Sequence, residues 1–103
     1  MSYQLLYLPT AQLDMRRIKE YLESEYSLSA YDRVASEIKE RIFDLVAMPR
    51  MYPVSQDDPR FRRMVCGNYL IFYTLDEANQ KVEVHHIWQG MRNIRAELKR
   101  ERH

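Results

Sequence analysis

Several features that mark special classes of protein are scarce or missing in this chain. It has one cysteine, two glycines and four prolines among 103 residues. The single thiol, Cys66, cannot form an intramolecular disulfide, which predicts a reducing compartment such as the cytoplasm. No apolar run approaches the ~20 residues that a membrane-spanning helix needs, and no basic-then-apolar leader follows Met1. These absences predict a small cytoplasmic protein.

The length and the apolar content predict one folded domain over residues 1–103. A chain of this length has room for a single core. Hydrophobic residues make up 46% of it, which is enough to fill that core and is not typical of a disordered chain.

The formal net charge is only +1, but the two halves of the chain differ in sign. Residues 1–57 carry seven Lys and Arg against nine Asp and Glu, whereas residues 58–103 carry nine against six. Seven of those nine basic residues are arginines, whose planar guanidinium suits phosphate or carboxylate groups. Ordinary surface charge explains this small excess equally well, because three charges alone do not define a nucleic-acid-binding protein.

The first half predicts a strand followed by a hairpin of two helices. An apolar, aromatic run over residues 3–8 favours a strand, after which Thr10 can cap a helix. One apolar stripe at helical spacing follows, made of Ala11, Met15, Ile18 and Leu22. Serines near residue 27 offer caps for the second helix, whose apolar face comprises Tyr31, Val34, Ala35, Ile38, Ile42, Leu45 and Val46. Proline disfavours helical backbone at the residue before it, so this helix is expected to stop at Met48-Pro49.

The second half changes to the patterning of strands. Residues 61–65, 69–75 and 82–88 are rich in β-branched and aromatic side chains, and short turns at 67–68 and 76–80 separate them. Short connections predict an antiparallel meander of three strands. The tail over 91–103 alternates basic and acidic residues and predicts a short terminal helix.

These elements predict an α+β fold of order β-α-α-β-β-β-(α), with a helical hairpin packed on one face of an antiparallel sheet. The first strand is expected to join the sheet at an edge. Side chains alternate along a strand, so Tyr69, Ile71 and Tyr73 should face the helices. Leu70 and Phe72 should then lie on the opposite face, where we expect an exposed apolar patch that a partner covers.

The order and spacing of motifs in the second half resemble a known family. A basic strand from Arg62 leads through Gly67-Asn68 into an aromatic strand, and a last strand closes on Gly90-Met91-Arg92-Asn93. This pattern is similar to the C-terminal signature of RelE/ParE toxins, the plasmid stabilisation proteins of bacterial type II toxin–antitoxin systems. The resemblance covers nearly the whole chain. It implies a RelE/ParE-like fold and neutralisation by a cognate antitoxin.

The family is divided in function, and the resemblance leaves both branches open. RelE-like members are metal-independent endoribonucleases (mRNA interferases) that cut mRNA in the ribosome, whereas ParE-like members inhibit DNA gyrase without recognisable catalytic groups. We rank the ribonuclease first, then the gyrase inhibitor, then a diverged, non-toxic antitoxin-binding module. The expected partners are therefore an antitoxin and either the ribosome with its mRNA or gyrase, with a homodimer or a heterotetramer with the antitoxin as the assembly. No cofactor or metal is expected.

Cleavage of RNA without metal needs a base, an acid and cations that hold the developing negative charge. The resemblance implies that Arg63 and Arg92 supply the cations. Two departures weaken this chemistry, because Leu70 and Leu98 stand where the ribonucleases have a catalytic arginine and tyrosine. The remaining proton carriers are His85 and His86; since neighbouring strand residues point oppositely, only one should face the site, and His86 is our candidate.

The remaining arginines of the second half form a predicted basic rim. Arg60 and Arg62 cluster with Arg63 at the first meander strand, and Arg95 follows the last strand together with Arg92. The functional interpretation is contact with nucleic-acid phosphates or with acidic residues of the antitoxin. The alternative, equally weighted, is a charged edge that prevents aggregation between strands.

Overall fold

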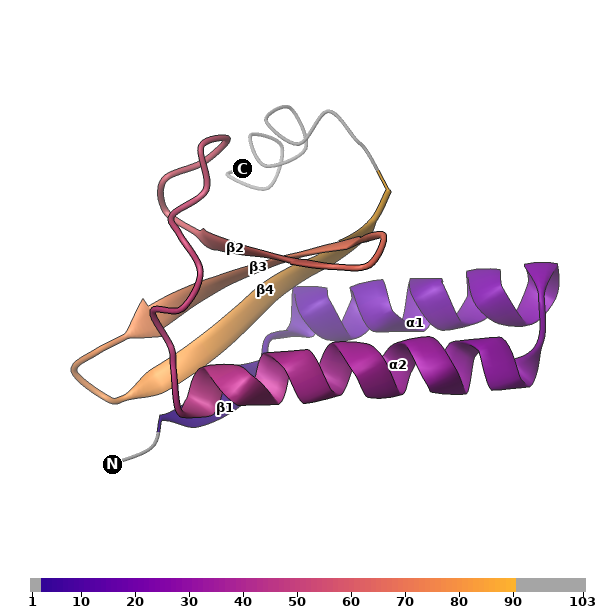
Figure 1. The fold of residues 1–103 in the computed structure, drawn as a ribbon, viewed down its shortest axis with the longest axis horizontal. Helices are drawn as coiled ribbons and strands as arrows, with labels where there is room; N and C mark the ends of the chain where they lie inside the picture. Colours follow the sequence, from indigo (N-terminus) through magenta and orange to yellow (C-terminus); the bar gives the residue numbers. More distant parts are fainter. Residues whose placement is uncertain (1–2, 91–103) are drawn as a thin grey trace.

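The computed structural model describes residues 3–90 and has two helices that run side by side along a twisted four-stranded sheet (Figure 1). The predicted terminal helix, and with it Arg92 and Arg95, lies outside the described residues. In chain order the elements are β1 (Gln4–Tyr7), α1 (Pro9–Glu25), α2 (Leu28–Phe43), a 3-10 turn (Asp44–Val46), β2 (Arg62–Cys66), β3 (Tyr69–Asp76) and β4 (Lys81–Gln89). The α+β class and the predicted element order are confirmed over this range.

The strands lie in the order β1-β4-β3-β2. The predicted meander is confirmed, because β2 pairs with β3 and β3 with β4, both antiparallel. β1 joins at the edge of the sheet as expected, but it runs parallel to β4, from Gln4 opposite Lys81 to Tyr7 opposite Val84, so the sheet is mixed. The reason is that two helices connect β1 to the meander, and a connection of this length permits either direction, unlike a tight turn.

The helix α1 begins one residue earlier than the predicted cap. Leu8 has the extended backbone of an N-cap, and Pro9 occupies the first turn, where its missing N–H costs nothing. Thr10 is therefore inside the helix, and the prediction that it caps the helix is wrong. The predicted apolar stripe is confirmed, because Ala11, Met15, Ile18 and Leu22 are all buried.

The helix α2 begins as predicted and ends early. The Ser27 hydroxyl accepts a hydrogen bond from the Ala30 N–H at 3.1 Å, which satisfies one free donor of the first turn. The α-helical backbone stops at Phe43, and a 3-10 turn carries the chain toward Pro49. From the predicted face, Ala35, Ile38, Ile42 and Leu45 are buried.

The core lies between the helices and the inner face of the sheet. Tyr69, Ile71 and Tyr73 belong to it together with the helix stripes, which confirms the predicted side of β3. None of the helices over residues 3–90 has the length and hydropathy of a membrane-spanning segment. The core thus uses one face of the sheet for both helices.

A second cluster occupies the outer face and consists of Phe61, Leu70, Phe72 and Trp88. The prediction of an exposed apolar patch there is wrong, because Leu70 is 6% and Phe72 0% exposed. Aromatic rings cover them: the Phe72 ring centroid lies 6.1 Å from that of Phe61 and 5.3 Å from that of Trp88, both edge-on. We call these four residues the outer cluster.

Candidate functional site

A β-bulge in β4 places both candidate histidines on the outer face. Phe72 is opposite His86 and Tyr73 is opposite Val84, so His85 is an extra residue without a partner on β3. A bulge interrupts the alternation of side chains. Both imidazoles consequently contact the ring of Phe61, with centroids 5.0 Å and 6.0 Å away. The prediction that only one of them faces this side of the sheet is wrong.

The apolar spacing of β4 carries a signal for this bulge. Val82 and Val84, two residues apart, point into the core, and the next core residue is Ile87, three residues further on. In a strand without a bulge, the residues whose side chains point inward are separated by an even number of positions. The odd step between Val84 and Ile87 therefore marks an inserted residue.

His86 is packed into the outer cluster rather than into an open cleft. Only 5% of His86 is exposed, a value similar to those of the outer-cluster residues. The centroid of its ring lies 4.8 Å from that of Trp88. Its Nδ1 atom lies 3.7 Å from Oδ2 of Asp14 on α1. The imidazole has little surface left with which to exchange a proton with a bound substrate.

His85 is half-buried and forms a hydrogen bond between its Nε2 atom and the Thr74 hydroxyl at 2.8 Å. Burial lowers the pKa of this imidazole below its ordinary value, and the nearby charges of His86 and Arg60 lower it further, while Glu83 opposes them. A neutral imidazole is therefore favoured near pH 7. Its ring serves as a hydrogen-bonding and packing group of the outer face.

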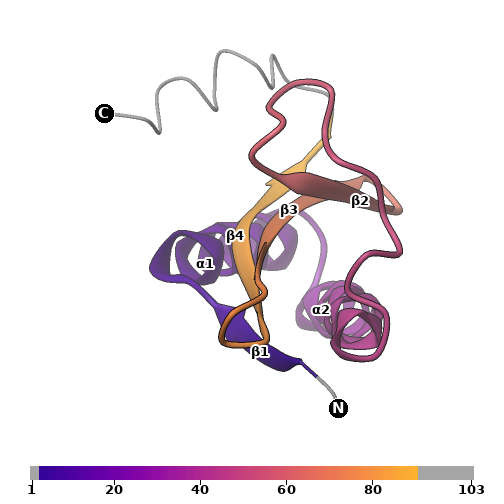
Figure 2. The same cartoon turned by 90° about the vertical axis from the view of Figure 1, so that its left-hand side faces the viewer.

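The helix α1 continues the edge of the sheet where β1 stops. The Leu8 N–H donates to the Val84 carbonyl at 3.0 Å, as a strand residue would. Beyond that point the Thr10 hydroxyl donates to the His85 carbonyl at 2.6 Å, and the Asp14 carboxylate accepts from the Ile87 N–H at 3.0 Å. Figure 2 shows α1 lying beside β4. Two polar side chains one helical turn apart thus satisfy the β4 edge, a role that sequence reasoning missed.

The predicted basic rim divides into three separate environments. Arg62 donates from Nη1 to the Tyr52 carbonyl at 2.7 Å and sits opposite Tyr73 in the ladder, toward the core side. Arg60 donates from Nε to the Asp58 carboxylate at 3.0 Å, and its guanidinium carbon lies 5.0 Å from the centroid of the Phe61 ring. Both guanidinium groups therefore form hydrogen bonds to other parts of the same chain.

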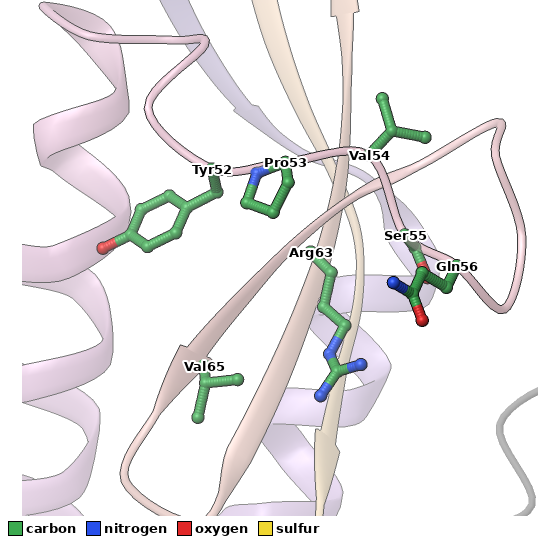
Figure 3. A pocket seen from close by; sticks show the side chains of 7 residues that line it. All are labelled: Tyr52, Pro53, Val54, Ser55, Gln56, Arg63 and Val65. Atoms are coloured by element: carbon green, nitrogen blue, oxygen red, sulfur yellow. The ribbon is translucent and has the colours of Figure 1, made fainter.

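Arg63 lies on the outer side of β2, opposite Phe72. Its Nη1 atom is 3.8 Å from Oδ2 of Asp57, a long ion pair, and 36% of its side chain is exposed. Together with Val65 and the loop from Tyr52 to Gln56 it lines an open groove of about 450 Å³ (Figure 3). The predicted site residue Arg63 therefore borders a groove on the outer side of the sheet.

The groups that could hold a metal are dispersed over the described range. No three His, Cys, Asp or Glu side chains within residues 3–90 come together as a metal site. Cys66 is buried on the inner face, and burial, with a smaller effect of Glu37, raises the pKa of its thiol. A buried thiol of raised pKa is a poor nucleophile.

The fold has the architecture of bacterial toxins from toxin–antitoxin pairs. It is similar to the chromosomal ParDE toxin–antitoxin system of P. aeruginosa, with a TM-score of 0.74, 14% identity and 86% of this chain and 97% of that chain covered. The toxin–antitoxin complex RelBE2 from Mycobacterium tuberculosis has a TM-score of 0.62 at 18% identity, covering 86% and 99% of the two chains. The isolated E. coli RelE toxin has a TM-score of 0.60 at 13% identity, covering 98% and 99%.

The sequence assigns the chain to a family. Residues 5–94 match the family described as the ParE toxin of the type II toxin–antitoxin system, parDE. No curated protein sequence matches the chain. The chain therefore belongs to the ParE toxin family of the RelE/ParE superfamily.

Proposed function

We propose that this toxin arrests growth by binding a protein target, DNA gyrase, without cleaving RNA, and that a cognate antitoxin neutralises it. The observation that carries the proposal is the burial of the candidate proton carrier. His86 is 5% exposed, packed against Trp88 and next to Asp14, so it has no open path to a substrate. A general acid or base must come within hydrogen-bond reach of the reacting proton.

The other components of a ribonuclease site are equally scattered. Arg62 and Arg60 are bound to the Tyr52 carbonyl and to Asp58, respectively, and are not gathered around one anion. Leu70, which stands where the ribonucleases have an arginine, is part of the buried outer cluster. A binding toxin requires none of these groups, and the match to the ParE family supports that branch.

The partners follow from the same family. Similar structures include the ParDE and RelBE2 toxin–antitoxin assemblies, which supports an antitoxin as the neutralising partner of this chain. Gyrase is the target that the resemblance to ParE-like toxins implies. The proposal therefore implies action in the cytoplasm, where the chromosome is.

The test is to express the chain without a partner in a bacterial host and to follow DNA, RNA and protein synthesis by pulse labelling. We expect DNA synthesis to fail first, with filamentation, and the purified protein to inhibit supercoiling by purified gyrase. The double variant His85→Gln, His86→Gln should remain toxic if circular dichroism shows it folded. The variant Arg33→Ala, changed at an exposed position of α2, is the matched control and should stay toxic.

Two outcomes would contradict the proposal. Rapid loss of protein synthesis with cleaved mRNA, abolished in the folded histidine double variant, would establish the ribonuclease instead. Unchanged growth at high expression would indicate a diverged, antitoxin-binding module.

A further inference from the structure

The turn between the two helices carries an exposed aromatic and apolar surface. Figure 1 shows α1 and α2 extending past the sheet at the end where they are joined. At this end Tyr21 is 42%, Tyr26 69% and Leu28 68% exposed. The rings of Tyr21 and Tyr26 meet edge-on, with their centroids 6.3 Å apart. We call residues 20–32 the hairpin tip. Large aromatic side chains that stay in water at a projecting position are typical of binding surfaces.

The backbone of the hairpin tip is held in place, although its side chains are exposed. The N–H groups of Tyr26 and Ser27 donate to the Leu22 carbonyl at 2.9 Å and 3.0 Å, which closes the last turn of α1. The Ser27 hydroxyl then accepts the Ala30 N–H and caps α2. Tyr26 is therefore fixed between two helix ends. A ring presented from a fixed backbone loses little conformational entropy when a partner binds it.

The hairpin tip carries charge of one sign only. Its residues include three tyrosines and four acids but no Lys, Arg or His, and the acids are Glu20, Glu23, Glu25 and Asp32. No basic side chain within residues 3–90 lies close enough to any of these carboxylates for an ion pair. Glu23 and Glu25 also occupy the last turn of α1, where the helix dipole disfavours negative charge. A positively charged partner would relieve this repulsion, so the charge of the hairpin tip favours a basic one.

We propose that the hairpin tip is the surface with which this toxin binds its protein target, and that it fits an apolar pocket rimmed by lysine and arginine on that target. The inference rests on the proposed function and deepens it, because gyrase acts on DNA and proteins that bind DNA present basic surfaces to its phosphates. A second copy of this chain fits less well. Two hairpin tips would repel each other, and Arg60 and Arg62 already bind groups of their own chain.

The experiment measures how the purified full chain binds purified gyrase and inhibits supercoiling, for wild type and for variants of the hairpin tip. Tyr26→Ala removes the exposed ring and leaves the backbone hydrogen bonds in place. It should weaken binding and inhibition by about tenfold or more. Tyr26→Phe keeps the ring and should change both by less than about threefold. Circular dichroism checks the fold, and if Tyr26→Ala is unfolded, Leu28→Ser replaces it and should weaken binding by about fivefold.

Charge is tested separately, by Glu20→Lys combined with Glu25→Lys, which reverses two exposed acids of the hairpin tip. This charge variant should bind about tenfold more weakly, and its binding should respond less to added salt than that of wild type. Glu37→Lys combined with Glu40→Lys makes the same change of net charge at exposed positions of α2 outside the hairpin tip. This matched control should stay within about threefold of wild type.

Inhibition of gyrase at wild-type strength by folded Tyr26→Ala and by the charge variant would overturn the inference, while the proposed function would stand. A concentration-dependent dimer of the chain that Tyr26→Ala abolishes would also overturn it, because the hairpin tip would then join two copies. A wild type that leaves gyrase active contradicts the proposed function instead. The hairpin tip is then tested on growth arrest alone, and folded variants that arrest growth like wild type would refute its role.

Discussion

Replacing Asp14 by alanine should destabilise the protein far more than its position on a helix surface suggests. The Asp14 carboxylate accepts the Ile87 N–H at 3.0 Å, and its side chain is only 11% exposed. Alanine leaves that N–H at the β4 edge without an acceptor, since β1 ends at Tyr7 and cannot reach it.

The magnitude follows from the groups involved. A hydrogen bond to a charged acceptor contributes about 1.5–3 kcal/mol, and a buried donor left unsatisfied costs about as much. Alanine's better helix propensity offsets roughly 0.5 kcal/mol of the loss. The expected net change is about 2 kcal/mol, which for a domain of this size lowers the melting temperature by roughly 10 °C.

Thermal unfolding followed by circular dichroism measures this difference. Asp14→Asn keeps an oxygen that can accept the Ile87 N–H and should lose about half as much stability. Arg17→Ala, at an exposed position on the same helix, is the matched control and should stay within about 0.5 kcal/mol of wild type. A melting temperature for Asp14→Ala equal to that of Arg17→Ala would refute the role of α1 as the continuation of the β4 edge.

Three further predictions concern single side chains. Tyr73→Phe removes the buried hydrogen bond from its hydroxyl to the Pro49 carbonyl (2.9 Å) and should cost about 1 kcal/mol in urea unfolding, without a change in slope. Because burial lowers the pKa of His85 below 6.5, the unfolded chain binds that proton first, so wild type should lose stability as the pH falls below about 6.5. His85→Gln should lose less over the same range, and equal losses would contradict the shift. Arg92 has an assigned role only in the ribonuclease alternative, so Arg92→Ala should still arrest growth; relief of growth arrest with little change in antitoxin affinity would favour the ribonuclease.

The repeated local patterns of the chain were sufficient to predict most of the fold. Local patterns show which face of each element is apolar. In α1 the pattern is the stripe from Ala11 to Leu22, and in β3 it is the alternation of Tyr69, Ile71 and Tyr73. Short turns then force neighbouring strands to pair antiparallel. Nothing local sets the direction of β1, because its partner β4 is distant in the sequence and the pairing depends on how the helices pack.

The candidate site was harder to predict because it depends on departures from regularity. Alternation placed His85 and His86 on opposite faces, and one inserted residue brought them together. Thr10 is a residue type that often caps a helix, yet its hydroxyl donates a hydrogen bond to the His85 carbonyl, 75 residues away in the sequence. Sequence alone also places Arg60, Arg62 and Arg63 in one cluster, whereas Tyr52, Asp58 and Asp57 draw them to separate partners.

The stacking on the outer face gives the protein an internal optical probe. Trp88 is its one tryptophan, and the Trp88 ring lies against His86 and Phe72. Its emission therefore reports on this small region of packed rings and not on an average over several positions. A ligand or substitution that disturbs the bulge in β4 will change that emission even when the helices stay intact, so fluorescence and circular dichroism can separate local from global unfolding.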